Sequence, residues 1–305
     1  MNASVGNLTG VETMSVTGVG PESVVPERWE FWRDRAGLGD RNMATDAALL
    51  RRAARRGAGG PGVWRCYSWA HPTLSFGRNE ATRGRFDDRS VARAGLRAVR
   101  RPTGGRALLH SREVTYSVAM PLAVDVVWRV AYDEINRLLL AALRSLGLPV
   151  DVVNTLPVEA DRAGHPAIRP DGPLCFAAPA LGEITAGGVK LVASSVWRER
   201  GAYLQHGSIL LHDDQGLIVG AASNPVPVPP SAAALSSLVA DGNRPDIAHG
   251  SPESDEAIRR TLVDAMEREL AAKYIVTPFT AEASMNADIT AFEEQFAGRD
   301  WLWRR

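Results

Sequence analysis

Strand-like runs and helices do not alternate along this chain, and this order constrains the fold more than any other feature. Short runs rich in Val, Tyr, Trp and Thr lie between residues 63 and 120, and a second group lies between 180 and 211. β-Branched and aromatic residues favour strands. Two such groups, without strict strand and helix alternation, predict an α+β fold with a mixed, largely antiparallel sheet flanked by helices.

Helical periodicity appears between and after the strand groups. Residues 41–57 have apolar side chains at spacings of three and four and end at Gly57, and residues 124–147 end at Gly147. These patterns predict amphipathic helices with glycine at their ends. Three further helices are predicted after the second strand group, near 231–240, 253–272 and 280–296.

Domain organisation follows from composition and length. Residues 1–26 are rich in Gly, Ser, Thr and Val without a usable period, which predicts a disordered N-terminal tail. The remaining length suits one large domain, so we expect residues 27–305 to form a single domain with C-terminal helices.

Charge and cysteine content exclude several classes of protein. The chain has 35 basic and 35 acidic residues, which argues against a nucleic-acid footprint or a polybasic membrane surface. No apolar stretch of membrane-spanning length and no signal peptide are evident, so we expect no membrane partner. Two cysteines and no CxxC or HxxxH spacing predict neither a disulfide framework nor a metal site, and they favour a reducing cytoplasm.

The two cysteines differ in their surroundings. Cys66 lies in a strand-like run and reads as a small buried hydrophobe. Cys175 lies in a proline-flanked loop, where nucleophiles are often found. Because a free thiol with a pKa of about 8.5 is only slightly ionised at neutral pH, a nucleophilic Cys175 requires a nearby cation.

A candidate cation follows fifteen positions later. Lys190 is one of only two lysines among the 35 basic residues, and lysine offers a compact, tunable charge that arginine does not. If the sequence AGG forms a hairpin turn, Lys190 lies within a pair or two of Glu183, and Lys190, Val192 and Ser194 share one strand face. The alternative is an exposed ion pair between Lys190 and Glu183 that contributes a few tenths of a kcal/mol.

Two other polar segments carry candidate chemistry. The sequence RRPTGGRALLH, residues 100–110, combines three arginines with a glycine pair, which suits close binding of a phosphate or carboxylate. It matches neither a P-loop nor a dinucleotide fingerprint, and a tight turn with solvated arginines is the alternative. In LQHGSILL, Gln205, His206 and Ser208 interrupt an apolar strand, and no order of serine, histidine and aspartate can be assigned.

These segments, taken in order with RNMATDAALL, RCYSWAHPTLSFGR, PLCFAAPALGEI and GVKLVASS, resemble the lipoate-protein ligase and octanoyltransferase family. The similarity runs from about residue 28 to 275. It implies the biotin/lipoate protein ligase catalytic-domain fold for the single domain, and the cysteine makes the chain most similar to the cysteine-dependent octanoyltransferases.

The resemblance also implies roles for individual residues. Cys175 would be the nucleophile, and Lys190 would contact the acyl carbonyl, lower the pKa of the Cys175 thiol and donate to the oxyanion. Val192 and Leu174 would line the acyl channel, which Ala193 would narrow in place of the family's glycine. The implied substrate-binding residues are Arg100, Arg101, Thr103, Gly104, Gly105, Arg106, His110, Ser194, Gln205 and His206.

The implied reaction is transfer of an octanoyl or lipoyl group from octanoyl-acyl carrier protein, through a Cys175 thioester, to a lysine of a lipoyl-domain protein. This acyltransferase reaction needs no cofactor. An ATP-dependent lipoate-protein ligase, which would use ATP and Mg²⁺, is one alternative. A catalytically divergent protein that only binds lipoyl domains or acyl cofactors is the other.

Overall fold

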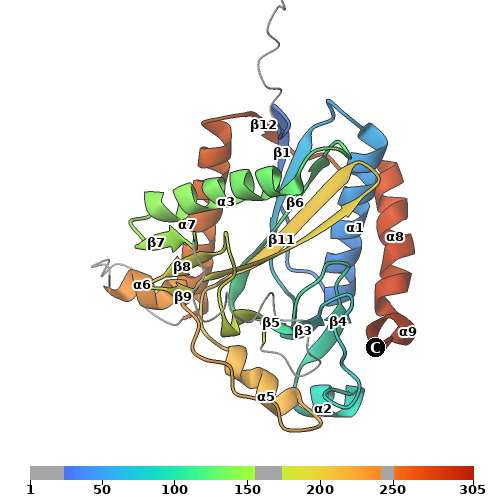
Figure 1. Cartoon of the computed structure of the whole chain (residues 1–305), viewed down its shortest axis with the longest axis vertical. Helices are drawn as coiled ribbons and strands as arrows, with labels where there is room; N and C mark the ends of the chain where they lie inside the picture. Colours follow the sequence, from blue (N-terminus) through green and yellow to red (C-terminus); the bar gives the residue numbers. More distant parts are fainter. Residues whose placement is uncertain (1–23, 155–173, 242–250) are drawn as a thin grey trace, which may run out of the picture.

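The computed structural model describes residues 24–154, 174–241 and 251–305. The expected N-terminal tail over residues 1–26 therefore lies almost wholly outside the described residues. The predicted α+β fold with a mixed sheet flanked by helices is confirmed (Figure 1). None of the described helices is both long enough and apolar enough to span a membrane.

A six-stranded sheet forms the centre of the molecule, with the order β10-β11-β6-β2-β1-β12. Its first four strands pair antiparallel, and β1 then pairs parallel with both β2 and β12. The strands are β1 (Arg28–Arg33), β2 (Gly62–Tyr67), β6 (Glu113–Pro121), β10 (Val192–Glu199), β11 (Ala202–Leu210) and β12 (Ile275–Pro278). Two strands far apart in the sequence, β1 and β12, thus lie side by side.

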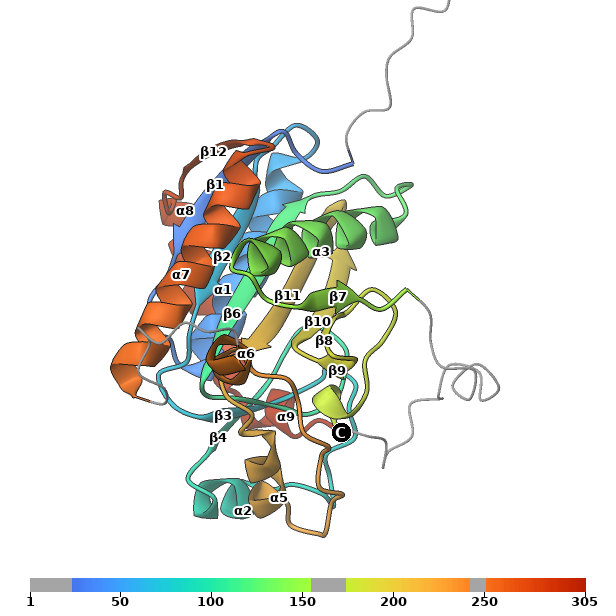
Figure 2. The ribbon, with the colours of Figure 1, turned by 90° about the vertical axis from the view of Figure 1, so that its left-hand side faces the viewer.

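Two small sheets lie at one end of the large sheet, as Figures 1 and 2 show. One has the order β4-β3-β5 and the other the order β7-β8-β9. Their strands are β3 (Thr73–Phe76), β4 (Arg97–Arg100), β5 (Leu108–His110), β7 (Val150–Val152), β8 (Ile184–Ala186) and β9 (Val189–Lys190). Residues 100–110, which hold the glycine pair, therefore contribute to the first small sheet, and the hairpin that contains Lys190 belongs to the second.

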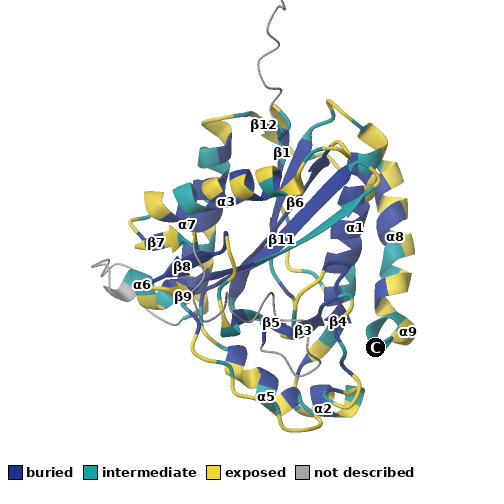
Figure 3. Cartoon of the chain, in the orientation of Figure 1, coloured by how far each residue is buried: buried dark blue, intermediate teal, exposed yellow. Residues whose placement is uncertain are grey.

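Helices cover both faces of the large sheet and bury its central strands (Figure 3). On one face lie α1 (Gly39–Arg56) and α8 (Ala283–Ala297), and on the other lie α3 (Trp128–Ser145) and α7 (Pro252–Ala271). These confirm four predicted helices, although α3 begins four residues later than its apolar pattern. The shorter helices are α2 (Asp88–Arg93), α5 (Ile218–Ala221), α6 (Leu235–Asp241), α9 (Arg299–Leu302), η1 (Cys175–Ala177) and η2 (Gln215–Leu217).

One expectation about the lysine strand is wrong. The chain does not run as one strand from residue 189 to 197, because the main-chain N–H of Leu191 donates to Ile184 and extends the β8–β9 hairpin. The chain then joins the large sheet at Val192. Lys190 and Ser194 therefore belong to different sheets and do not share a strand face.

Gly77, directly after β3, fixes how closely the glycine-rich loop approaches the small sheet. A Cβ at this position would lie 2.0 Å from the carbonyl oxygen of Gly105. We expect Gly77→Ala to lower the free energy of unfolding by about 1 to 3 kcal/mol, because the clash forces backbone to move. Urea denaturation measures this change.

Gly220→Ala is the matched control, since its Cβ would meet open space within helix α5. Alanine favours helix over glycine, so this variant should be as stable as the original protein or slightly more stable. Equal unfolding midpoints for the two variants would show that the backbone approach at Gly77 is not a constraint.

Candidate active site

A pocket lies where the large sheet, the glycine-rich loop and η1 meet. It brings together six of the predicted site residues, namely Arg101, Gly105, His110, Cys175, Ser194 and His206. Its other lining residues are Met43, Tyr67, Leu108, Thr115, Ala193, Ser195, Gly207 and Ser208. The remaining predicted residues, Arg100, Thr103, Gly104, Arg106, Lys190 and Gln205, are not among those that line it.

The glycine-rich loop closes around an arginine of the chain itself. The buried Arg101 guanidinium donates from Nε to Gly104 O at 3.1 Å and from Nη2 to Arg106 O at 2.8 Å. Gly105 has a φ of +95°, and a Cβ there would lie 2.6 Å from Nη2 of Arg101. Glycine is needed at this position both for the backbone angle and for the space. The glycine pair was predicted to let the backbone approach a ligand closely. In the structure, the backbone approaches the guanidinium of Arg101 instead.

Arg101 and Arg100 point in different directions although they are consecutive. Arg101 Nη1 donates to both the carbonyl and the hydroxyl oxygen of Ser75, at 3.0 Å each. Arg100 instead donates to Gly77, Glu80 and Leu302 carbonyls and to Thr82 Oγ1, which ties the small sheet to the C-terminal segment. Burial lowers the pKa of Arg100 to about 10. Arg100 therefore has a structural role in the contacts observed.

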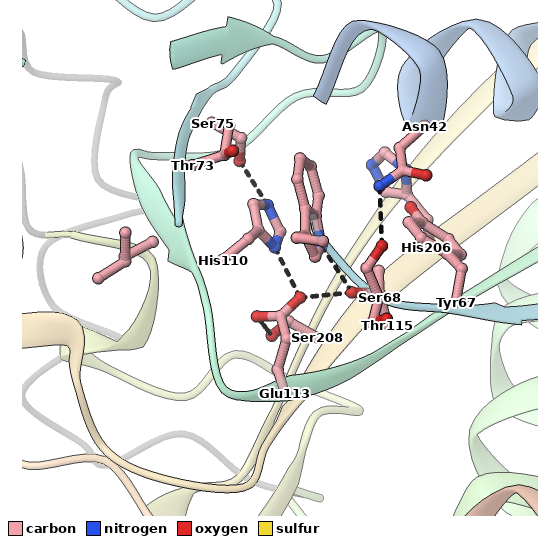
Figure 4. A network of polar contacts seen from close by, with 12 residues as sticks. Asn42, Tyr67, Ser68, Thr73, Ser75, His110, Glu113, Thr115, His206 and Ser208 are labelled. Carbon is pink, nitrogen blue, oxygen red and sulfur yellow. Dashed lines mark hydrogen bonds and ion pairs between the residues drawn. The ribbon is translucent and has the colours of Figure 1, made fainter. Parts of the chain in front are cut away.

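His110 is held on both ring nitrogens and on one ring face (Figure 4). Its Nδ1 lies 2.7 Å from Glu113 Oε1, its Nε2 lies 2.8 Å from Ser75 Oγ, and its ring stacks on Trp69 at 4.0 Å between centroids. Thr115 and Ser208 also donate to the buried Glu113 carboxylate. The carboxylate, supplied by the start of β6, therefore has three donors.

His206 is held in a second, separate set of contacts. Its Nδ1 lies 2.9 Å from Asp46 Oδ2 on α1, and its Nε2 lies 2.6 Å from Thr103 Oγ1. Burial lowers the pKa of His206 below 6.5 in spite of the hydrogen bond to Asp46. Burial alone would raise the pKa of Asp46, but the contacts with His206 and Arg65 hold it below its usual value. The pair is therefore a neutral imidazole beside a carboxylate at pH 7.

Cys175 and Lys190 meet through the main chain. Cys175 is partly exposed, its N–H donates to Ala107 O at 3.1 Å, and its carbonyl accepts from Lys190 Nζ at 2.8 Å. Lys190 Nζ also lies 2.7 Å from Glu183 Oε2. The predicted pairing of Lys190 with Glu183 is confirmed. Both side chains are buried, so the prediction of an exposed ion pair is wrong. Loss of either partner would leave a buried charge.

Of the other predicted residues nearby, Ser194 lines the pocket, whereas Gln205, Val192 and Leu174 are buried away from it. Ser194 Oγ lies 2.7 Å from Tyr116 Oη. Gln205, on the side of the sheet that α3 covers, donates from Nε2 to the same hydroxyl at a distance of 2.9 Å. Gln205 therefore positions Tyr116 beneath Ser194. Val192 and Leu174, expected to line an acyl channel, are packed in core clusters and do not line this pocket.

Cys66 is buried, as predicted, and burial raises the pKa of its thiol to about 12. Within the described ranges, no three His, Cys, Asp or Glu side chains are arranged to hold a metal ion.

Sequence comparison gives one family. The model of the lipoyl protein ligase A/B catalytic domain matches residues 39–242. A protein of Kyrpidia tusciae named octanoyltransferase LipM is 32% identical over 92% of this chain and 100% of its own length. The octanoyltransferase LipM of Moorella thermoacetica is 41% identical over 174 residues, which are 56% of this chain and 60% of that protein.

Solved structures agree in fold. A lipoate-protein ligase A bound with ATP has a TM-score of 0.65 at 18% identity, covering 92% of this chain and 99% of the other. A bipartite lipoate protein ligase from Thermoplasma acidophilum has a TM-score of 0.64 at 16% identity, covering 90% and 96%. At these identities the structures support the fold alone. Since the family model and the Kyrpidia alignment each span most of the chain, the protein belongs to the lipoyl protein ligase A/B catalytic domain family.

Proposed function

We propose that this protein is an octanoyltransferase that moves an octanoyl group from acyl carrier protein to Cys175 and then to a lysine of a lipoyl-domain protein. The observation that carries the proposal is a partly exposed cysteine on the wall of a pocket that it shares with five other predicted site residues. The relatives named octanoyltransferase LipM support the acyl group and the reaction class.

The chemistry proceeds in two balanced steps. The Cys175 thiolate forms a bond to the octanoyl carbonyl carbon while the bond from that carbon to the donor sulfur breaks, and the released donor thiolate takes up a proton. The acceptor lysine amine then bonds to the same carbon, loses a proton to solvent, and releases Cys175 as a thiolate. The split into two transfers is the usual advantage of a covalent intermediate.

Lys190 is proposed to orient the cysteine and to donate to the acyl oxygen. Its bond to the Cys175 carbonyl supports a position beside the reacting thioester, and Glu183 holds the ammonium group in place. Among the substrate contacts, Arg101, Gly105, His110, Ser194 and His206 are supported by their place on the pocket wall. Arg106, Thr103 and Gly104 belong to the loop that shapes that wall.

The proposed reaction needs no cofactor, and we place it in the cytoplasm, where free thiols such as those of Cys66 and Cys175 persist. The ATP-dependent ligase is the second candidate, because a structure with ATP bound shares the fold. A ligase would form an acyl-adenylate from free lipoate, ATP and Mg²⁺ whether or not Cys175 is present. A pure binding protein would bind the lipoyl domain without turnover.

Incubation with octanoyl-acyl carrier protein tests the nucleophile. We expect intact-mass analysis to show one added octanoyl group, less one hydrogen, on the original protein and none on Cys175→Ala, because the thioester forms on that sulfur. Cys66→Ala is the matched control and should be acylated normally, since Cys66 is buried in the core. An unmodified original protein, or adenylate formation that survives Cys175→Ala, contradicts the transferase.

A second prediction concerns the lysine. Lys190→Arg keeps a positive charge near Glu183 but replaces the compact ammonium with a wider planar group. We expect the single-turnover rate of octanoyl transfer to fall by about 10²- to 10³-fold, as for loss of one oxyanion donor. Lys273→Arg is the control, because Lys273 lies at the end of α7 away from the pocket, and it should leave the rate unchanged. A Lys190→Arg rate equal to that of the control would remove Lys190 from the proposed mechanism.

A further inference from the structure

Four charged or titratable groups from different elements contact Cys175 or line its pocket, and three of them are already paired. Lys190 is paired with Glu183, and it is not among the pocket-lining residues. His206 faces Asp46, and His110 faces Glu113. Arg101 is the fourth, and it lines the same pocket as Cys175.

Arg101 is a buried cation whose near contacts are all neutral. Its guanidinium makes four hydrogen bonds, to the carbonyls of Gly104 and Arg106 and to the two oxygens of Ser75. In the part of the chain that the structure describes, Arg101 forms no ion pair, and the charged or ionisable groups that influence it are Cys175 first and then Glu80. Burial of an unneutralised charge is costly, so a guanidinium in this position calls for a negative partner.

The geometry brings the main chain of Cys175 and the guanidinium of Arg101 to one short segment. Arg101 Nη2 is bonded to Arg106 O, and the Cys175 N–H is bonded to Ala107 O, so the two are anchored to consecutive carbonyl groups. Burial lowers the pKa of Arg101, and a negative charge on Cys175 is the first influence that opposes this lowering. Cys175, which lines the same pocket, is therefore the candidate for the negative partner.

The hydrogen-bond partners of Ser75 and His110 determine where the hydrogens of these two side chains point. Because Arg101 Nη1 donates to Ser75 Oγ, the hydroxyl hydrogen of Ser75 is free to point to His110 Nε2 (Figure 4). His110 Nε2 then accepts, so its Nδ1 carries the hydrogen and donates to Glu113. Glu113 thus selects the tautomer that leaves Ser75 oriented as an acceptor for Arg101.

We propose that Arg101 is the cation that stabilises the Cys175 thiolate, and that Ser75, His110 and Glu113 are positioning residues that hold its guanidinium. His110 then acts through Ser75 and Arg101. This inference rests on the proposed role of Cys175 as nucleophile, but its test uses no acyl donor.

The test measures the rate of Cys175 alkylation by iodoacetamide as a function of pH, with peptide mass spectrometry to resolve the two cysteines. Arg101→Met should raise the apparent pKa of Cys175 alkylation by about 1 to 3 units, the usual effect of removing a nearby opposite charge. Ser75→Ala should raise it by less, and Arg101→Lys should largely retain the original value because the charge stays. Cys66 is the internal control and should not react in the same pH range.

Arg100→Met is the matched control, since it removes the preceding buried guanidinium, which bonds toward the C-terminal segment. Its alkylation pKa should equal that of the original protein, and unfolding midpoints establish that each variant is folded at the assay temperature. An unchanged pKa in Arg101→Met and Ser75→Ala, an equal shift in Arg100→Met, or a shift only in Lys190→Met overturns the inference. If octanoyl transfer fails but Arg101→Met still raises the apparent pKa of Cys175 alkylation, the proposed function is wrong and the Arg101–Cys175 interaction is supported.

Discussion

Hydrogen bonds from one buried guanidinium hold the pocket wall in shape. Arg101 joins β3, through Ser75, to two carbonyls of the loop that leads into β5. Each of these acceptors must be present, because a buried donor without a partner costs about 1 to 3 kcal/mol. The glycines at 77 and 105 follow from the same requirement, since side chains there would occupy the space of the loop or of the guanidinium.

Local signals in the sequence predicted one part of the site well. The AGG turn set the hairpin that brings Lys190 to Glu183, and the proline-flanked loop indicated an accessible Cys175. Both are features of neighbouring residues, so pattern and turn chemistry suffice to find them. The strand break at Leu191 was missed because an apolar run of this kind carries no mark of a change of sheet.

Contacts between residues that are far apart in the sequence could not be predicted from its pattern. Asp46 lies on a helix and reads as an ordinary polar position, yet it meets His206 from β11. Glu113 begins a strand and meets Ser208 through a side-chain contact that depends on the pairing of β6 with β11. The directions of Arg100 and Arg101 depend on the side-chain alternation at the end of β4, and a one-residue error in the strand boundary would exchange them.

The pairing of β1 with β12 has a consequence for the order of folding. β1 lies between β2 and β12, and the residues that pair in β1 and β12 are far apart in the sequence. During synthesis the outer edge of β1 therefore stays open until residue 278 has left the ribosome, and an open strand edge promotes association between chains. A chain that stalls or is cut before β12 keeps this edge open, which makes it prone to aggregate even when every pocket residue is present.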